Sequence, residues 1–314
     1  MTLRVFKPGL LTTVQDAGRI GHAALGVGNS GAADAVALRL GNALVGNAAN
    51  DAALEFTLIG PRLRFSVSAT VALIGDCAAS IDGKPFASWR RATISAGTTL
   101  DCGSLRRGAR GYLAVRGGFD VAQILGSRST DVNAGIGRPL AAGDELPLHE
   151  SEDPAGDAAW SLDPRPWFDF DSQHPIRLVP GSHFDHLDAE SRAALFSREF
   201  RVAADSNRVG WRFDGMPLRL AAALELISTG VVPGTLQLPP GGKPIVLGVE
   251  GPTSGGYPRI AHVVNVDLAV LAQRRPGDAI RFALTTLDDA EQSMRERDTA
   301  LRRLEAAIHA RRQP

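Results

Sequence analysis

Residues 8–47 read PGLLTTVQDAGRIGHAALGVGNSGAADAVALRLGNALVGN, a glycine-rich stretch that leads into one strongly patterned helix. Glycine loses more backbone entropy on folding than other residues, so this density indicates unusual dihedral angles or a backbone that a ligand approaches closely. The helical pattern has Ser30 as its candidate N-cap, Asp34 in its first turns and Gly46 as its stop. A glycine loop before a helix N-terminus offers free N–H groups, which predicts an anion-facing loop.

Length and charge bound the class of protein. The chain has 314 residues, with 34 basic and 34 acidic side chains and no net charge. This length suffices for two domains, and the balanced charge argues against nucleic acid or a membrane surface as a partner. No signal peptide and no run of roughly 20 apolar residues is present, which predicts a cytoplasmic protein. Cys77 and Cys102 form no CxxC motif and are expected to be reduced, buried and structural.

Short strands dominate the rest of the first half, at residues 63–65, 70–74, 92–95, 111–115 and 145–148. A single long helical pattern is too little for a doubly wound parallel sheet, so a mainly β barrel or sandwich is favoured. The expected organisation is an N-terminal β-barrel domain at 1–150, an acidic, Pro-rich linker at 151–172, a C-terminal β-barrel domain at 173–286 and a C-terminal amphipathic helix at 287–314. Its apolar stripe holds Met294, Leu301, Leu304 and Ile308.

Two short repeated patterns in the sequence suggest that the two halves of the chain are related. Leu54-Glu55 with Gly60 is echoed by Leu224-Glu225 with Gly230, and Arg138-Pro139 with Gly143-Asp144 is echoed by Arg275-Pro276 with Gly277-Asp278. Such echoes are weak evidence of duplication taken alone. The aromatic side chains of the linker are expected to fix it to a domain surface; they are Trp160, Trp167, Phe168 and Phe170.

Several familiar cofactor motifs are missing or incomplete. Residues 26–31 fit GxGxxG before a helix, but β-rich sequence follows in place of βαβ units. Gly83-Lys84 and Gly242-Lys243 are each followed by proline, so neither is a P-loop. His183 and His186 lack further ligands at metal-binding spacing. The residues thus favour a small-molecule site without a tightly bound metal.

Two serine–arginine loops stand out, Ser127-Arg128-Ser129-Thr130 and Ser206-Asn207-Arg208. Arginine binds carboxylate or phosphate in bidentate fashion, and neighbouring hydroxyls add neutral donors. The alternative is a turn whose arginine pairs with a local Asp. In the second half, Gln237 and Glu250 stand beside glycine loops, and an amide and a carboxylate near exposed backbone suit recognition of a small polar substrate. A plain β-turn remains the alternative there.

The chain resembles the biotin-dependent carboxyltransferase / allophanate hydrolase subunit 2 family over about residues 3–284. The matching motifs are PGLLTTVQDAGR at 8–19, SGAAD at 30–34, NALVGN at 42–47, LEFTLIGP at 54–61, YLAVRGG at 112–118, LGSRST at 125–130, SNR at 206–208, PGTLQ at 233–237 and TSGGYP at 253–258. The resemblance implies two tandem cyclophilin-like β-barrel domains with a cleft between them.

In function, the resemblance implies the C subunit of a 5-oxoprolinase-type complex that uses ATP to open 5-oxo-L-proline to L-glutamate and is inactive as a lone chain. It implies two partners: a companion of the KipI-like / allophanate hydrolase subunit 1 family, and a LamB/YcsF-like protein. One alternative is a carboxyltransferase component of a urea carboxylase or allophanate-type system, with biotin carried by a partner. A second alternative is a KipA-like regulatory binding protein without catalysis.

The expected site combines these patterns with the resemblance. Four residues are expected in catalytic roles, as polar organisers, acid/base groups or anion ligands: Asp16, Asp34, Arg128 and Arg208. The expected substrate-binding residues are Arg19, Ser30, Ser127, Ser129, Thr130, Ser206, Gln237, Thr253 and Tyr257.

Two departures from the family pattern bear on the substrate. Pro252 stands where family members commonly carry glutamine, and proline removes both the side-chain amide and a backbone donor. Loss of such a substrate contact costs about 1–3 kcal/mol. Residues 131–138 are also shorter than the usual Gly-rich insertion. Both changes leave the expected fold intact and leave the substrate open.

Overall fold

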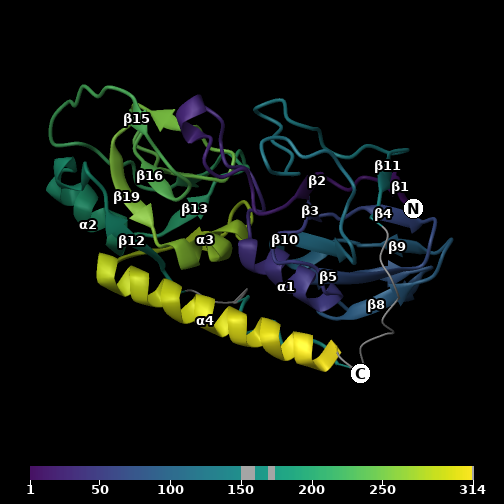
Figure 1. The fold of residues 1–314 in the computed structure, drawn as a ribbon. Coiled ribbons are helices and arrows are strands. Elements are labelled where there is room, and N and C mark those ends of the chain that lie inside the picture. The colour runs from purple at the N-terminus through teal and green to yellow at the C-terminus, as the bar shows by residue number, and fades with distance from the viewer. Residues whose placement is uncertain (150–159, 169–173, 313–314) are drawn as a thin grey trace. The chain divides into compact units, whose positions relative to one another are not determined.

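The computed structural model describes residues 1–149, 160–168 and 174–312 (Figure 1). The chain forms two compact units: unit 1 holds Met1–Arg19, Ser30–Phe170 and Leu301–Pro314, and unit 2 holds Ile20–Asn29 and Asp171–Ala300. Most of the expected linker at 151–172 lies outside the described residues. The chain is mostly β with barrel-like sheets and a C-terminal helix, as the sequence predicts.

Unit 1 consists of two facing sheets. Its strands are β1 Thr2–Lys7, β2 Thr12–Gln15, β3 Ala53–Thr57, β4 Arg62–Phe65, β5 Ala69–Cys77, β6 Ser80–Ile81, β7 Lys84–Pro85, β8 Arg91–Ile94, β9 Thr99–Asp101, β10 Leu105–Val115 and β11 Glu145–Pro147. One sheet has the order β11-β1-β4-β9-β6-β7 and the other β2-β3-β10-β5-β8. All five strand segments expected in the first half are confirmed.

The core of unit 1 lies between these sheets, because alternate side chains of each strand point inward. In β4, Leu63 and Phe65 are fully buried while the intervening Arg64 is exposed. Phe56 of β3 packs into the same core from the other sheet. Gly111 of β10 is required there, since a Cβ would lie 2.3 Å from the Phe56 ring.

Helix α1 spans Ala35–Val45 and ends at Gly46, which has φ 87°, as expected. The expectation that Ser30 caps this helix is wrong. Asp34 is the cap, and its carboxylate accepts the N–H groups of Val36 and Ala37 at 3.1 and 3.0 Å. Ser30 has φ 50° and lies in a left-handed turn, which places it too early to reach the first helical N–H groups.

Unit 2 is built on an eight-stranded sheet of order β20-β13-β14-β17-β16-β19-β12-β21, with a separate two-stranded ribbon, β15-β18. Its strands are β12 Ile176–Pro180, β13 Phe200–Val202, β14 Gly210–Asp214, β15 Thr229–Gly230, β16 Thr235–Gln237, β17 Ile245–Leu247, β18 Ser254–Gly255, β19 Arg259–Val263, β20 Ala279–Ile280 and β21 Phe282–Leu284. Only Arg281 separates the two edge strands, β20 and β21, along the chain. The sheet must therefore curl until its edges meet, which gives it a barrel-like form.

The turn ahead of the last barrel strands is repeated in the two units. In unit 1 the turn at 141–144 exchanges two backbone hydrogen bonds of 2.8 Å with Val5. In unit 2 the turn at 275–278 does the same with Val202, at 2.7 and 3.0 Å. The Gly-Asp echo in the sequence therefore corresponds to one repeated structural feature.

The other expected repeat, between the two Leu-Glu pairs, is wrong. Leu54 and Glu55 are buried in β3, whereas Leu224 and Glu225 lie in a loop outside the named strands, with Glu225 exposed. A Leu-Glu pair followed by glycine is short enough to arise in unrelated contexts.

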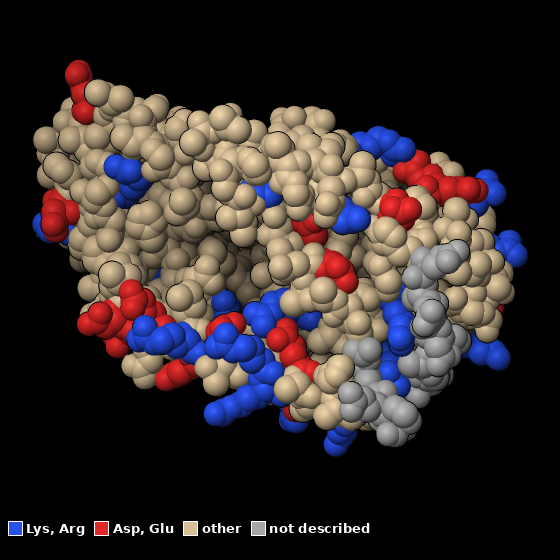
Figure 2. Space-filling model, in the orientation of Figure 1, with Lys and Arg blue, Asp and Glu red and all other residues tan. Residues whose placement is uncertain are grey.

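The remaining helices are α2 Ala189–Ser197, α3 Asn265–Ala272 and α4 Leu287–Arg312. The expected C-terminal helix is confirmed, and its residues from Leu301 onward belong to unit 1. Leu301 and Ile308 are buried, but Met294 is 45% exposed and lies outside the buried stripe. Figure 2 shows acidic and basic side chains alternating along α4. Within the described residues, no helix combines the length and apolarity needed to cross a membrane.

Two smaller expectations are confirmed in unit 1. Cys77 and Cys102 are buried and carry free thiols, and burial raises the pKa of Cys77 to about 12. Phe168 packs against Trp89 with ring centroids 4.6 Å apart, and the Arg311 guanidinium lies over the Trp160 ring. Trp160 and Phe168 thus attach the linker region to unit 1, while Phe170 lies outside the described residues.

Candidate functional site

Asp16 organises the serine–arginine loop of unit 1, at residues 127–130. Its carboxylate accepts hydrogen bonds from the hydroxyls of Ser127 and Ser129, both at 2.6 Å. It also accepts the backbone N–H groups of Arg128 and Gly18, at 2.6 and 2.8 Å. The glycine loop and the 127–130 loop, more than 100 residues apart in the chain, are therefore held together by one buried side chain.

These donors keep Asp16 charged. Burial by itself raises the pKa of Asp16, but the two serine hydroxyls and two backbone N–H groups outweigh it, and the pKa lies below its usual value. A carboxylate that accepts four hydrogen bonds and has a lowered pKa is a poor proton acceptor at neutral pH. The geometry therefore suits an organiser of the loop rather than a general base.

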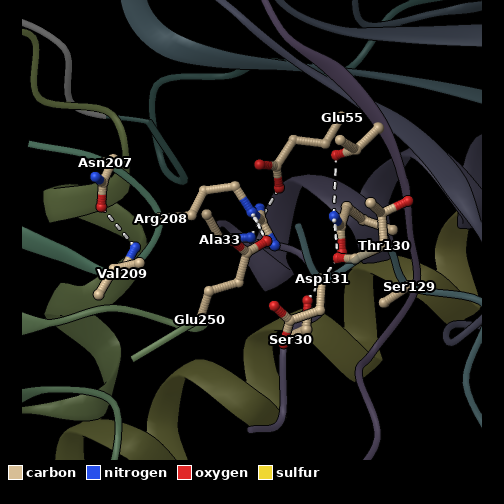
Figure 3. Close-up of polar contacts among 12 residues, drawn as sticks. Ser30, Ala33, Glu55, Ser129, Thr130, Asp131, Asn207, Arg208, Val209 and Glu250 are labelled. Carbon is tan, nitrogen blue, oxygen red and sulfur yellow. Dashed lines mark hydrogen bonds and ion pairs between the residues drawn. The ribbon is translucent and has the colours of Figure 1, made fainter. Parts of the chain in front are cut away.

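Further bonds fix the same loop from the glycine-rich segment. The Arg19 guanidinium donates to the Ser129 carbonyl. The Ser30 hydroxyl and the Gln15 amide both donate to the Thr130 carbonyl, at 2.7 and 3.0 Å; Figure 3 shows the contact with Ser30. Six of the expected site residues of unit 1 thus lie in one network: Asp16, Arg19, Ser30, Ser127, Ser129 and Thr130.

A cavity of about 310 Å³ lies on this loop within unit 1. Its apolar wall is formed by Val14, Val121, Ala122, Ile124, Ile136, Leu140 and Leu146. Its polar wall includes residues 127–130, Arg138 and Asp144, and the last two form an ion pair of 2.7 Å. In the described parts of the chain, the Arg128 side chain has no carboxylate partner, and its Nε makes no hydrogen bond. Arg128 therefore brings a guanidinium without an ion-pair partner among the described residues to this cavity, whose lining also includes Glu145.

The short segment at 131–138 forms another part of the cavity wall. Asp131 and Ile136 exchange two backbone hydrogen bonds, at 2.8 and 2.9 Å, so the loop closes as a tight hairpin. Ile136, Gly137 and Arg138 then line the cavity. The segment at 131–138 therefore forms part of the cavity wall.

Asp34 belongs to a separate buried cluster. Besides capping α1, its backbone N–H donates to the Tyr112 hydroxyl at 2.8 Å. Tyr112 in turn donates to Glu55 at 2.7 Å, and Glu55 also accepts the Ala33 N–H at 2.8 Å. Burial and the nearby carboxylates raise the pKa of Tyr112 well above its usual range. This cluster fixes the start of α1, and sequence reasoning missed Glu55 and Tyr112 because they are distant in the chain.

In unit 2, the serine–arginine loop at residues 206–208 is arranged differently. The Arg208 guanidinium donates to the Glu250 carboxylate at 2.5 Å, and both side chains are at least 96% buried (Figure 3). Ser206 accepts the Arg212 N–H at 3.0 Å, and Asn207 accepts the Val209 N–H at 2.8 Å. Here the arginine pairs with a carboxylate 42 residues away, a contact that no spacing in the sequence indicates.

The other expected residues of unit 2 lie around the β15-β18 ribbon. Gln237, at the end of β16, is buried. Thr253 accepts the Val231 N–H through its carbonyl at 3.0 Å, and Tyr257 is 47% exposed. Pro252 is exposed just ahead of the ribbon. The described residues contain no group of three or more His, Cys, Asp or Glu that could hold a metal ion.

Comparisons with known proteins agree with this architecture. The family described as "Carboxyltransferase domain, subdomain A and B" matches residues 25–284. The chain is 36% identical to the C subunit of 5-oxoprolinase from Escherichia coli, over 98% of this chain and 99% of that protein. It is also 36% identical to the C subunit of 5-oxoprolinase from Haemophilus influenzae, over 92% of this chain and 93% of that protein.

A solved structure extends the likeness to larger proteins. The crystal structure of the K. lactis urea amidolyase matches with a TM-score of 0.87 and 30% identity, over 96% of this chain and 20% of that chain. The resemblance stated from the motifs is thereby confirmed. This chain belongs to the carboxyltransferase domain family, with both its A and B subdomains.

Proposed function

We propose that the chain is the C subunit of a 5-oxoprolinase-type complex, which opens 5-oxo-L-proline to L-glutamate with ATP and requires a KipI-like partner and a LamB/YcsF-like partner. The observation that carries this proposal is the match to two proteins of that name across nearly the whole chain. Relatives of matching length and 36% identity support a shared role more strongly than a likeness to one segment of a larger enzyme.

The cavity of unit 1 supports the proposal chemically. An unactivated lactam resists hydrolysis, and transfer of the ATP γ-phosphoryl group to the lactam oxygen creates a better electrophile. One water then adds to the ring carbon, the C–N bond breaks, and a second water releases phosphate from the resulting acyl phosphate. Negative charge appears on oxygen in these steps, and the Arg128 guanidinium beside the apolar wall of the cavity stabilises it.

The residues of unit 1 then take distinct roles. Arg128 binds the anionic group, while Ser127, Ser129 and Thr130 form the loop that holds it. Asp16 and Arg19 position that loop, and Asp34 fixes α1. These assignments give Asp16 and Asp34 no proton-transfer step, because both carboxylates are buried and occupied by N–H and O–H donors.

Reconstitution tests the proposal directly. Purified chain is mixed with its two companion proteins, ATP and 5-oxo-L-proline, and glutamate is measured. The complete mixture should form glutamate, and omission of any one of the three proteins should abolish it. Absence of glutamate from the complete mixture would contradict the proposed activity, and full turnover without this chain would contradict its catalytic role.

The Arg128→Gln variant tests the role of the cavity. Loss of one charged contact should lower kcat/KM about 10- to 100-fold, with little change in the melting temperature because Arg128 has no ion-pair partner in the described structure. Arg64→Gln is the matched control, since Arg64 also lies in unit 1 but bonds the Gly97 carbonyl away from the cavity. Equal loss of activity in both variants, or a fall in melting temperature matching the loss of activity, would mark Arg128 as structural.

Carboxyl transfer from biotin is the second candidate function. The family match and the likeness to urea amidolyase favour it. The test replaces ATP and 5-oxo-L-proline with carboxylated biotin and urea in the same reconstituted mixture. Urea-dependent loss of the carboxyl group, absent without this chain, would favour transfer over lactam opening.

A further inference from the structure

The β15-β18 ribbon of unit 2 covers two donor side chains that face each other across the sheet. Gln237 of β16 is the register partner of Arg259 of β19. Cross-strand partners project from the same face of a sheet, with their Cβ atoms about 5 Å apart. Arg259 donates to the carbonyl of Gly230 in β15 at 3.2 Å, and Gln237 lies against Gly255 in β18. The ribbon therefore contacts both members of the pair.

Gln237 is buried with an unused donor. Only 4% of the residue is exposed, and its Nε2 has no hydrogen-bond partner among the described residues. A buried N–H group without a partner destabilises the fold, so such groups are rare unless a ligand or water completes them. The Gln237 amide is therefore expected to donate to a ligand or a water molecule.

Gly255 leaves the space beside that amide. A Cβ at this position would lie 2.7 Å from Gln237 Nε2. Gly255 is not among the residues with positive φ, so its backbone conformation does not require glycine. Because Gly255 has no side chain, a small group of a ligand can approach the Gln237 amide.

Arg259 supplies the positive charge at this place. Apart from the Gly230 carbonyl, its guanidinium has no acceptor in the described part of the chain, and it forms no ion pair there. Burial first, and the charge of Arg259 second, lower the pKa values of the neighbouring His183 and His262. Both histidines are accordingly neutral near pH 7, so the charge felt by an incoming ligand comes from Arg259.

We propose that Gln237 and Arg259 form a carboxylate-binding subsite beneath the β15-β18 ribbon. One carboxylate oxygen accepts from the Gln237 amide and the other from the Arg259 guanidinium, a charge-assisted arrangement that satisfies the buried donor. Under the proposed function, on which the identity of the ligand rests, this group is the carboxylate of 5-oxo-L-proline. Arg259 thus joins the substrate-binding residues as a specificity determinant for acids over amides.

Calorimetric titration of the full-length chain tests the subsite. The probes are 5-oxo-L-proline and its uncharged analogue 5-oxo-L-prolinamide, and wild-type chain should bind the acid at least about tenfold more tightly. Gln237→Leu and Arg259→Gln should each weaken binding of the acid about tenfold or more. Arg201→Gln is the matched control, because Arg201 also lies in unit 2 and donates to a backbone carbonyl, that of Gly277, at 3.0 Å. It should leave binding unchanged.

Thermal unfolding separates a binding role from a structural one. Gln237→Leu should keep or raise the melting temperature, because it removes a buried donor that the fold does not use. A marked fall would show that the amide supports the fold and would overturn the proposal. No binding of the acid, equal binding of the amide, or equal loss in Arg201→Gln would also overturn it. Failure of the reconstituted complex to make glutamate, together with the expected titration pattern, would reject the proposed function and leave the subsite standing.

Discussion

Each of the two serine–arginine loops, at 127–130 and 206–208, lies beside a buried carboxylate, but the two carboxylates have different hydrogen-bond partners. In unit 1, Asp16 is surrounded by hydroxyl and N–H donors, and the Arg128 side chain makes no ion pair in the described structure. In unit 2, Glu250 holds the Arg208 guanidinium at 2.5 Å. The serine–arginine loop of unit 1 therefore presents a cation to a cavity, whereas the arginine of the loop in unit 2 forms an ion pair with Glu250.

The difference follows from how each carboxylate is satisfied. A buried carboxylate needs several donors or a cation, because desolvation without compensation is costly. Asp16 receives four bonds from neutral groups, so it needs no guanidinium, and Arg128 remains available. An arginine in a serine–arginine loop can therefore be assigned to a ligand only once the donors to the nearby carboxylate are known.

The ion pair of unit 2 gives the largest predicted effect. Glu250→Ala should lower the free energy of unfolding by about 3–5 kcal/mol, because it removes the carboxylate that pairs with the buried Arg208 guanidinium. Urea unfolding of the variant measures this loss.

An apolar replacement of both partners is the control. Arg208→Met with Glu250→Leu should restore most of the stability, since the desolvation cost of both charges disappears together. A loss in the double variant equal to that of Glu250→Ala would mean that the ion pair is not the source of the effect.

Asp16→Asn should have the next largest effect, about 2–4 kcal/mol at pH 7, because its charge-assisted hydrogen bonds are weakened. The folded pKa of Asp16 lies below its unfolded value, so the carboxylate stabilises the fold above pH 4 or so, and this contribution is lost as the pH falls further. The difference between wild type and variant should therefore shrink on acidification. A difference that stays constant from pH 7 to about pH 3 would contradict the role of the charge.

Local patterns in the sequence were sufficient for much of the fold. Alternation of apolar residues predicted the strands of unit 1, and Gly46 correctly ended α1. The Ser30 cap failed because the left-handed turn at Ser30 and Gly31 depends on close approach to the backbone of Gly18. Such an approach joins distant segments and has no local signature.

The candidate site was predictable only in part. Glycine and hydroxyl motifs marked Asp16 and the 127–130 loop, which the structure brings together. Arg208 and Glu250 lie just beyond the paired strands β14 and β17, and Gln237 opposes Arg259 across β16 and β19, so both pairs depend on how strands distant in the sequence come together. The register shift at Gln237 decides which residue opposes it, and nothing within a few residues in the sequence specifies that shift.

The smallest predicted effect concerns the turn that is repeated in the two units, at 141–144 and 275–278. Asp144 accepts the Ala141 N–H at 2.8 Å, and Asp278 accepts the Arg275 N–H at 2.7 Å, so alanine at either position should cost about 1 kcal/mol. Asp144 also pairs with Arg138, an exposed partner, and salt screens such pairs. Urea unfolding should therefore be measured at low and at high salt. The loss in free energy of unfolding caused by Asp144→Ala should change more with salt than the loss caused by Asp278→Ala. Identical salt responses would mean that the turn hydrogen bond alone accounts for both positions, and that the added ion pair of unit 1 contributes nothing to its stability.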